Sequence, residues 1–202
     1  MTPIVVFDLG KVLVDFDYSI AAKRVAAHCA KRIEDLHDVL GGSSILVQLE
    51  SGLITRAQFF SEIQKLTGFA GTTDEFLGYF ADIFFPMPPM IELHAGLREK
   101  KIPTYIFSNT NDIAVEHIRR RFPFFGHFDG YILSYEVGSM KPNTKIYEAL
   151  EAMSGRRGAD IFYIDDRLEN VEAGAARGWQ MVLHETPEKT RAALEKFLAT
   201  RV

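Results

Sequence analysis

The sequence is poor in cysteine, with Cys29 as the single example among 202 residues. One cysteine cannot form an internal disulfide framework, so a reducing, cytoplasmic location is expected. No uncharged apolar stretch approaches the roughly 18 residues of a membrane span, and no signal peptide is visible at the start of the chain. We therefore expect no membrane partner.

Concentrated positive charge is also missing. The formal net charge is -4, and no run of Lys and Arg side chains is longer than the three arginines at 119–121. The electrostatic footprint of a nucleic-acid-binding protein is thus absent. The six histidines lack a metal-ligand spacing such as H-E-x-x-H, and no G-x-G-x-x-G loop follows the first apolar run. We therefore expect neither a histidine metal site nor a dinucleotide site.

What the chain does contain is a series of short apolar runs rich in β-branched and aromatic residues. The runs are continuous rather than alternating, which is typical of parallel strands covered on both faces. They extend over residues 4–9, 103–108, 159–165 and 180–184, with a weaker candidate at 130–133. Helical patterns lie between or beside them at residues 88–100, 111–121, 143–153, 168–177 and 187–199. The alternation predicts an α/β fold with a doubly wound, Rossmann-like parallel sheet.

Residues 16–85 interrupt this alternation and show no strand pattern. Ala22, Val25, Ala26 and Cys29 follow the spacing of an amphipathic helix. Two capping-box signatures begin at Thr55 and Thr72, and an apolar stripe that includes Phe84 follows the second. We predict a small all-helical cap at residues 16–85, inserted after the first strand, and a core made of residues 1–15 and 86–202.

Polar groups end the predicted strands where a parallel sheet brings them together. Asp8 ends the first run, Ser108 the second, and Asp165-Asp166 the third. Sheets of this kind bind ligands at the carboxyl ends of their strands. The Asp8 carboxylate is a candidate nucleophile that attacks phosphorus and forms an acyl phosphate. Two like charges about 4 Å apart repel by roughly 4 kcal/mol at an effective dielectric near 20, so cations must offset that repulsion.

Mg²⁺ and a lysine are the cations that this set of residues suggests. Mg²⁺ prefers oxygen ligands, which Asp8 and Asp166 would supply together with the Gly10 carbonyl. Lys141 would add a second positive charge. Ser108, with the Asn109 backbone N–H, would donate hydrogen bonds to the phosphoryl oxygens.

Taken singly, these fragments have ordinary structural explanations. An aspartate after a strand often forms a turn, Ser108-Asn109-Thr110 suits a helix cap, and a lone lysine such as Lys141 is usually solvated. The Asp165-Asp166 pair is the stronger signal, because adjacent acids repel unless a cation or partner relieves them. The functional prediction therefore rests on the ordered combination.

That combination resembles the haloacid dehalogenase superfamily of phosphohydrolases. Four motifs match in order: Phe-Asp-Leu-Gly at 7–10, Ser-Asn-Thr at 108–110, Lys-Pro at 141–142 and Ile-Asp-Asp-Arg-Leu-Glu-Asn at 164–170. The helical insert looks like the small cap that this family places between its first two motifs. The resemblance covers essentially the whole chain. It implies that Asp8 is the nucleophile, that Ser108 binds phosphate, that Lys141 steadies both, and that Asp166 holds Mg²⁺. Asp165 stands where many members have glycine, so it is either a direct metal ligand or a neighbour of one.

Position 10 departs from the family pattern. Phosphatases of the family usually carry a second aspartate there, which protonates the leaving group and then activates water. Glycine cannot supply this general acid–base catalysis, which typically contributes 10²–10⁴-fold to a rate. Three consequences are open at this stage. In the first, the substrate has a good leaving group that needs little protonation. In the second, Asp15, Asp17 or a residue of the cap substitutes as the acid. In the third, hydrolysis is lost and the protein is a relative that binds a phosphometabolite or a partner.

We favour the first consequence. A sugar 1-phosphate leaves as an anomeric hydroxyl, which is more acidic than an ordinary alcohol. The segment at residues 8–15 looks like the branch of the family that includes bacterial α-D-glucose-1-phosphate phosphatase. We therefore predict a Mg²⁺-dependent phosphatase acting on a small phosphorylated substrate, with a monomer favoured. The polar or aromatic candidates for cap specificity are Phe16, Asp17, Gln48, Glu50 and Arg56.

Overall fold

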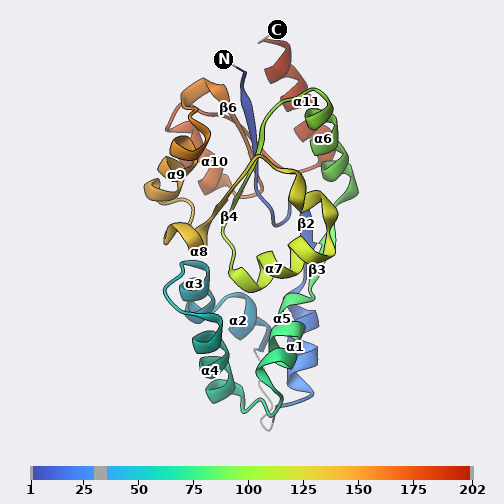
Figure 1. Cartoon of the computed structure of the whole chain (residues 1–202), viewed down its shortest axis with the longest axis vertical. Helices are drawn as coiled ribbons and strands as arrows, with labels where there is room; N and C mark the ends of the chain where they lie inside the picture. The colour runs from blue at the N-terminus through green and yellow to red at the C-terminus, as the bar shows by residue number, and fades with distance from the viewer. Residues whose placement is uncertain (1, 30–35, 201–202) are drawn as a thin grey trace.

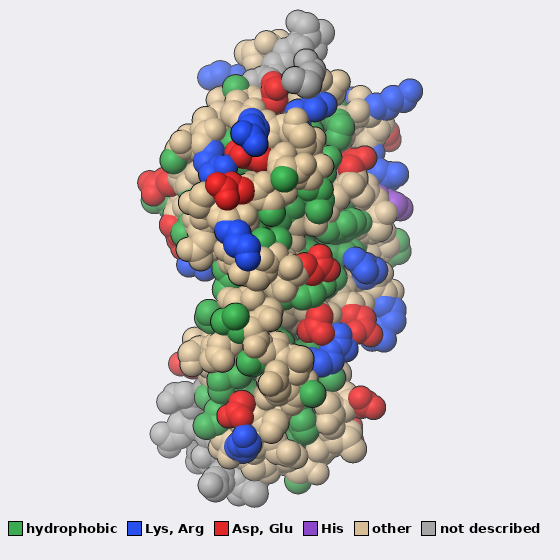
Figure 2. Space-filling model, turned by 60° about the vertical axis from the view of Figure 1, so that its left-hand side comes forward, with side chains coloured by type: hydrophobic (Ala, Val, Ile, Leu, Met, Phe, Trp, Pro, Cys, Tyr) green, Lys and Arg blue, Asp and Glu red, His purple; other side chains and the backbone are tan. Residues whose placement is uncertain are grey.

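A computed structural model describes residues 2–29 and 36–200, arranged as two bodies along the long axis of the molecule (Figure 1). One body holds the main sheet and the helices from Pro88 onwards. The other holds the helices of residues 18–81. Both ends of the chain lie at the pole of the sheet body that is remote from the helical insert (Figure 1). In space-filling view the molecule narrows between the two bodies (Figure 2).

The main sheet has five parallel strands in the order β5-β4-β1-β6-β7. They are β1 (Ile4–Phe7), β4 (Thr104–Ser108), β5 (Gly130–Leu133), β6 (Ile161–Asp165) and β7 (Gln180–Leu183). All five predicted strands are therefore confirmed, including the weak candidate at 130–133, although β1 ends two residues early. Asp8 follows β1 directly, and its N–H still donates to the Ile164 carbonyl at 2.8 Å.

Helices cover both faces of this sheet, which makes it doubly wound (Figure 1). Side chains of β1 alternate between two apolar clusters, Val5 and Phe7 on one face and Ile4 and Val6 on the other. The first cluster includes residues of α6 (Pro88–Glu99), α7 (Asp112–Arg121) and α11 (Pro187–Ala199), and the second includes residues of α9 (Thr144–Ser154) and α10 (Leu168–Ala175). The short elements are α8 (Ser134–Val137) and the 3₁₀ turns η1 (Pro123–His127) and η2 (Gly158–Asp160).

The insert is a bundle with its own apolar core. Its helices are α1 (Tyr18–Ala26), α2 (Leu36–Gly41), α3 (Ser44–Glu50), α4 (Arg56–Thr67) and α5 (Thr73–Ala81). Phe59, Phe76 and Phe80 are buried and contact one another within this core. Both predicted capping boxes form, at the N-termini of α4 and α5. The prediction of a helix reaching Cys29 is wrong, because α1 ends at Ala26 and Cys29 bridges to Phe69 instead.

Two short strands, which the sequence analysis missed, join the insert to the sheet body. Strands β2 (Val14–Phe16) and β3 (Phe84–Pro86) pair antiparallel, with Phe16 opposite Phe84. The expectation that Phe84 belongs to a helical stripe is wrong, because α5 ends at Ala81 and the chain then extends. Strands of three residues are too short to display an alternating pattern. The predicted domain boundaries fall inside this ribbon, and the division into domains stays a prediction. Within the described residues, no helix is both long and apolar enough to cross a membrane.

Candidate active site

The predicted site residues meet at the carboxyl edge of the main sheet. Ser108 and Asp165 are the last residues of β4 and β6, the two strands that flank β1. Asp8 is the first residue after β1, and Asp166 is the first after β6. Lys141 arrives from the loop between α8 and α9. The convergence follows from the parallel topology, since each strand ends at the same edge.

Lys141 is the best anchored group at this edge. Its side chain is 1% exposed, and its Nζ lies 2.8 Å from the Phe107 carbonyl oxygen, 2.6 Å from Asp165 Oδ2 and 3.0 Å from Asp8 Oδ1. These three acceptors match the three protons of an ammonium group. Burial lowers the pKa of Lys141, but the carboxylates of Asp8 and Asp165 outweigh that effect and raise it. The lysine is therefore a fixed positive charge.

Asp8 presents one of its two carboxylate oxygens to the site. Its Oδ1 accepts hydrogen bonds from the Leu9 N–H at 2.7 Å and lies beside the Lys141 ammonium, which leaves Oδ2 outside these contacts. Burial raises the pKa of Asp8 to about 7; Lys141 lowers it, and repulsion from Asp165 and Asp166 adds to the rise. The ammonium of Lys141 alone therefore does not neutralise the carboxylates gathered here.

Asp165 has donors on both of its oxygens. Oδ2 accepts from Lys141 and from the Tyr163 hydroxyl, while Oδ1 accepts from the Arg167 N–H at 2.9 Å and from the Asn170 amide at 3.0 Å. Burial raises the pKa of Asp165, but Lys141 more than compensates, and the carboxyl stays ionised. Four donors fill about four lone-pair positions of a carboxylate. Asp165 thus serves as the structural centre of the site.

Asp166 is in a different environment. It is only partly buried, and both burial and repulsion from Asp165 raise its pKa. One carboxylate oxygen from each of Asp8, Asp165 and Asp166 can be chosen so that all three lie within 4.8 Å of one another. Carboxylate oxygens are the hard ligands that Mg²⁺ selects, and a divalent cation here would lower the raised pKa values of Asp8 and Asp166. The residues present therefore fit a magnesium ion.

The turn after β1 offers a further oxygen. A bridge between Gly10 and Val14 uses the N–H groups of Lys11 and Val14 and the carbonyls of Val14 and Leu9. The Gly10 carbonyl takes no part in those bonds. Its role as a metal ligand stays a prediction.

Ser108 and Asn109 lie where β4, the strand next to β1, ends. Ser108 is 2% exposed, and its hydroxyl donates to the Asn109 carbonyl at a long 3.4 Å. The Asn109 side chain brackets the backbone of Lys141, accepting from its N–H at 2.7 Å and donating to its carbonyl at 3.0 Å. The expected helix cap is displaced by one residue, because Asn111 rather than the Ser108-Asn109-Thr110 triplet caps α7.

Three groups at this site escaped the sequence analysis. The Asn109 side chain positions Lys141, and the Tyr163 hydroxyl holds Asp165. Asn111 lines the same pocket as Glu50 of the insert. A weak signal existed for Tyr163 alone. It stands two residues before Asp165 in an otherwise apolar strand, so both side chains lie on the same face.

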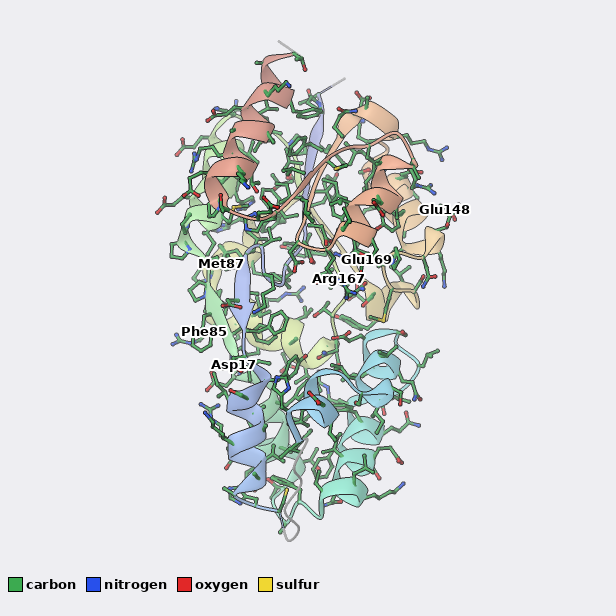
Figure 3. The ribbon with its side chains drawn as sticks, turned by 180° about the vertical axis from the view of Figure 1, so that it is seen from behind. Asp17, Phe85, Met87, Glu148, Arg167 and Glu169 are labelled. Carbon is green, nitrogen blue, oxygen red and sulfur yellow. The ribbon has the colours of Figure 1, made fainter. Side chains whose placement is uncertain are left out.

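Of the cap candidates named from the sequence, two line a pocket at the sheet edge and three have contacts elsewhere. Phe16 and Glu50 line a small pocket together with Gly10 and Ser108. Asp17, by contrast, accepts from the Ser19 N–H and caps α1 at the end of the ribbon (Figure 3). Gln48 donates to the Ser44 carbonyl within α3. Arg56 pairs with Asp112 and Glu116 of α7 and so ties α4 to the sheet body, away from that pocket.

Comparison with known proteins agrees with this geometry. A family model described as a haloacid dehalogenase-like hydrolase matches residues 2–178. The chain belongs to this family. The helical insert after β1 and β2 and the five-stranded sheet order are the fold that solved members of the family share with it.

Two curated members of the family are similar to this chain over most of their length. A D-ribitol-5-phosphate phosphatase of Bacteroides thetaiotaomicron is 26% identical, over 96% of this chain and 97% of that protein. The pyrimidine 5′-nucleotidase YjjG of Escherichia coli is 28% identical, over 90% of this chain and 88% of that protein. A solved enzyme of the family from B. thetaiotaomicron, in complex with magnesium and inorganic phosphate, has a TM-score of 0.80 and 25% identity, covering 90% of this chain and 93% of its own.

Proposed function

We propose that this hydrolase is a Mg²⁺-dependent phosphatase that acts on small phosphomonoesters through an aspartyl-phosphate on Asp8. The observation that carries the proposal is the way in which the Asp8 carboxylate is held. One oxygen is fixed by the Leu9 N–H and Lys141, the other takes no part in those contacts, and the carboxyl group belongs to the acidic cluster with Asp165 and Asp166. A carboxylate held in this way is oriented for attack without a conformational search.

Asp8, Asp166 and the Gly10 carbonyl are the groups we assign to Mg²⁺. Asp165 belongs to the same cluster, but its lone pairs face donors from the protein, so we assign it to holding Lys141. When bound, the ion would screen the repulsion between the phosphate dianion and Asp8. Magnesium in the complex of the structural relative supports this assignment.

The remaining residues hold the phosphoryl group. Ser108 and the Asn109 N–H donate to its oxygens, and Lys141 balances charge on both the phosphate and Asp8. The long bond from the Ser108 hydroxyl is weak enough to be exchanged for a phosphoryl oxygen. Lys141 keeps its position because the Asn109 side chain hydrogen-bonds both its N–H and its carbonyl.

The substrate we propose is a sugar or polyol phosphate. The two curated relatives are a ribitol-5-phosphate phosphatase and a nucleotidase, both of which support a phosphomonoester. Gly10 and the residues that follow it keep the hexose 1-phosphates of the glucose-1-phosphatase branch among the candidates. A monomeric state and a cytoplasmic location stay predictions from the sequence.

Phosphate release tests the proposal. The panel comprises sugar 1-phosphates, sugar and polyol phosphates esterified at a primary hydroxyl, and an activated aryl phosphate, each with Mg²⁺ and with chelator. We expect Mg²⁺-dependent release that Asp8→Asn abolishes and that Asp74→Asn, at an exposed cap carboxylate, leaves unchanged. A folded wild-type protein that releases no phosphate from any compound would instead favour the binding role that Gly10 left open.

A further inference from the structure

A small pocket lies between the sheet edge and the helical insert, next to the proposed phosphate site. Gly10, Ser108 and Asn109 line it from the sheet body, and Tyr18 and Glu50 line it from the insert. An in-line attack by Asp8 sends the leaving group away from that carboxylate, and the pocket beside Ser108 and Asn109 is the space in which we place it. Among the pocket-lining residues of the described chain, Glu50 is the one carboxyl group.

The fold presses Glu50 against the sheet body. Glu50 is the last residue of α3, and the turn that follows contains Gly52 in the left-handed region at a φ of +67°. A Cβ built on Gly52 would overlap the carbonyl oxygen of Tyr135, in α8 of the sheet body. Only glycine allows this approach, so the end of α3 and the Glu50 side chain lie at the boundary of the two bodies.

The surroundings of Glu50 suit a carboxyl group that gains and loses a proton. Burial raises its pKa to about 7, while the charge of Arg167 and the neighbouring Asn111 side chain lower it. Arg167 extends from the loop after β6, at the edge of the sheet body that faces the insert (Figure 3). On the insert side, burial raises the pKa of Tyr18, and Glu50 raises it further, so this hydroxyl stays neutral. An acid with a pKa near the working pH is suited to proton transfer in both directions.

The two other acids considered from the sequence are committed elsewhere. Asp15 is exposed and paired with Lys11, whose hydrogen bond lowers the pKa of that carboxyl. Asp17 is exposed, and its pKa is lowered by its hydrogen bonds to Ser19. Both carboxyls are therefore ionised at neutral pH and have no proton to give.

From this geometry we infer that Glu50 is the general acid and base of the reaction, supplied by the cap in place of the side chain that Gly10 lacks. The inference rests on the proposed phosphatase function. As the Asp8 oxygen bonds to phosphorus, the bond from phosphorus to the leaving oxygen breaks, and that oxygen takes the Glu50 proton to form an alcohol. The Glu50 carboxylate then takes a proton from water, whose oxygen attacks the phosphorus and releases phosphate and the Asp8 carboxylate.

Leaving-group dependence tests this role. In Glu50→Gln, formation of the phosphoenzyme from an alkyl phosphate should slow by about 100-fold to 10,000-fold, because an alkoxide must leave unprotonated. With an aryl phosphate the first step needs little protonation. The variant should then release a rapid burst of one phenol per chain, followed by slow turnover, since the water attack still lacks its base. Glu62→Gln, at an exposed cap glutamate paired with Lys65, is the matched control and should behave as wild type.

Four outcomes would overturn the inference. Equal loss of the first step with alkyl and aryl phosphates, or a rise in KM alone with alkyl phosphates, would make Glu50 a substrate-binding residue. A leaving-group effect from Asp15→Asn, with none from Glu50→Gln, would move the acid to Asp15. Absence of turnover in the wild type with every phosphate would remove the proposed function and this inference together.

Discussion

The ring of Phe16 occupies the space that a side chain at position 10 would need. A Cβ built on Gly10 would lie 2.9 Å from Cε1 of that ring. The ring is held in place, because it packs edge-on against Tyr18 and Phe84 and lies beneath the Lys11 ammonium. The absence of an aspartate at position 10 is thus matched by an aromatic residue that fills the space.

This relationship predicts that an acid cannot simply be restored at position 10. Gly10→Asp alone should lower turnover of alkyl phosphates, because the new side chain displaces the Phe16 ring and disturbs the ribbon. The gain from a new acid should appear only where the cap acid is missing. In a Glu50→Gln, Phe16→Ala background, Gly10→Asp should raise kcat/KM for alkyl phosphates by about tenfold or more, because a general acid typically contributes about 10²–10⁴-fold. Equal kcat/KM values with and without the new aspartate in that background would contradict this account.

Asn109 should matter through its side chain and not only through its backbone. Asn109→Ala removes two hydrogen bonds to the Lys141 backbone, at 2.7 and 3.0 Å. Loss of such bonds at a partly buried site costs about 1–3 kcal/mol, and misplacing the lysine should lower kcat/KM by roughly ten- to a hundredfold. Asn143→Ala, at a nearby exposed asparagine, is the control. Unchanged kcat/KM in Asn109→Ala would show that Lys141 needs no such support.

Gly52 should set the position of Glu50. Gly52→Ala places a Cβ against the Tyr135 carbonyl and strains a positive φ, whereas Gly155→Ala strains a similar φ of +64° with nothing within 4 Å. Both variants should lose about 1 kcal/mol or more of stability, as expected for a non-glycine residue in this conformation. Only Gly52→Ala should also slow the turnover of alkyl phosphates. Comparing kcat/KM with the midpoint of thermal unfolding for the two variants separates the effects.

The stability of the metal-free protein should depend on Asp8. The pKa of Asp8 is about 7 in the folded state and 3.8 in the reference state, so the folded chain binds this proton more tightly. The resulting stabilisation is complete below about pH 4 and is lost as the pH rises through 7. Asp8→Asn should therefore raise the unfolding midpoint of the metal-free protein at pH 8, and much less at pH 4. An equal or lower midpoint at pH 8 would contradict the repulsion at this site, and added Mg²⁺ should stabilise the wild type more than the variant.

Much of the fold could be predicted from the sequence because its signals are local. The continuous apolar runs of β1, β4 and β6 mark buried parallel strands, and strand ends in such a sheet must share an edge. This is why the sequence predicts that Asp8, Ser108 and Asp165 lie close together. The capping boxes at Thr55 and Thr72 were also readable, since each depends on a spacing of three residues.

What escaped prediction depends on contacts between distant parts of the chain. The strands β2 and β3 are each three residues long, which is too short to show a periodic pattern in the sequence. The hydrogen bonds between the Asn109 side chain and the Lys141 backbone join positions 32 residues apart, and the sequence near either residue gives no signal of them. Glu50 was named only as one of several cap candidates, because its place beside Gly10 depends on how α3 meets the sheet body.

The central claim is that Asp8 carries the phosphoryl group during turnover. Acid quenching within milliseconds of mixing the enzyme, Mg²⁺ and an aryl phosphate, followed by mass analysis of the peptide that contains Asp8, tests it directly. We predict a phosphorylated Asp8 that forms and decays at the rate of turnover, and that accumulates in Glu50→Gln because its hydrolysis is slow. Turnover that proceeds with this peptide unmodified at every time point, or with phosphate on another residue, would contradict the account.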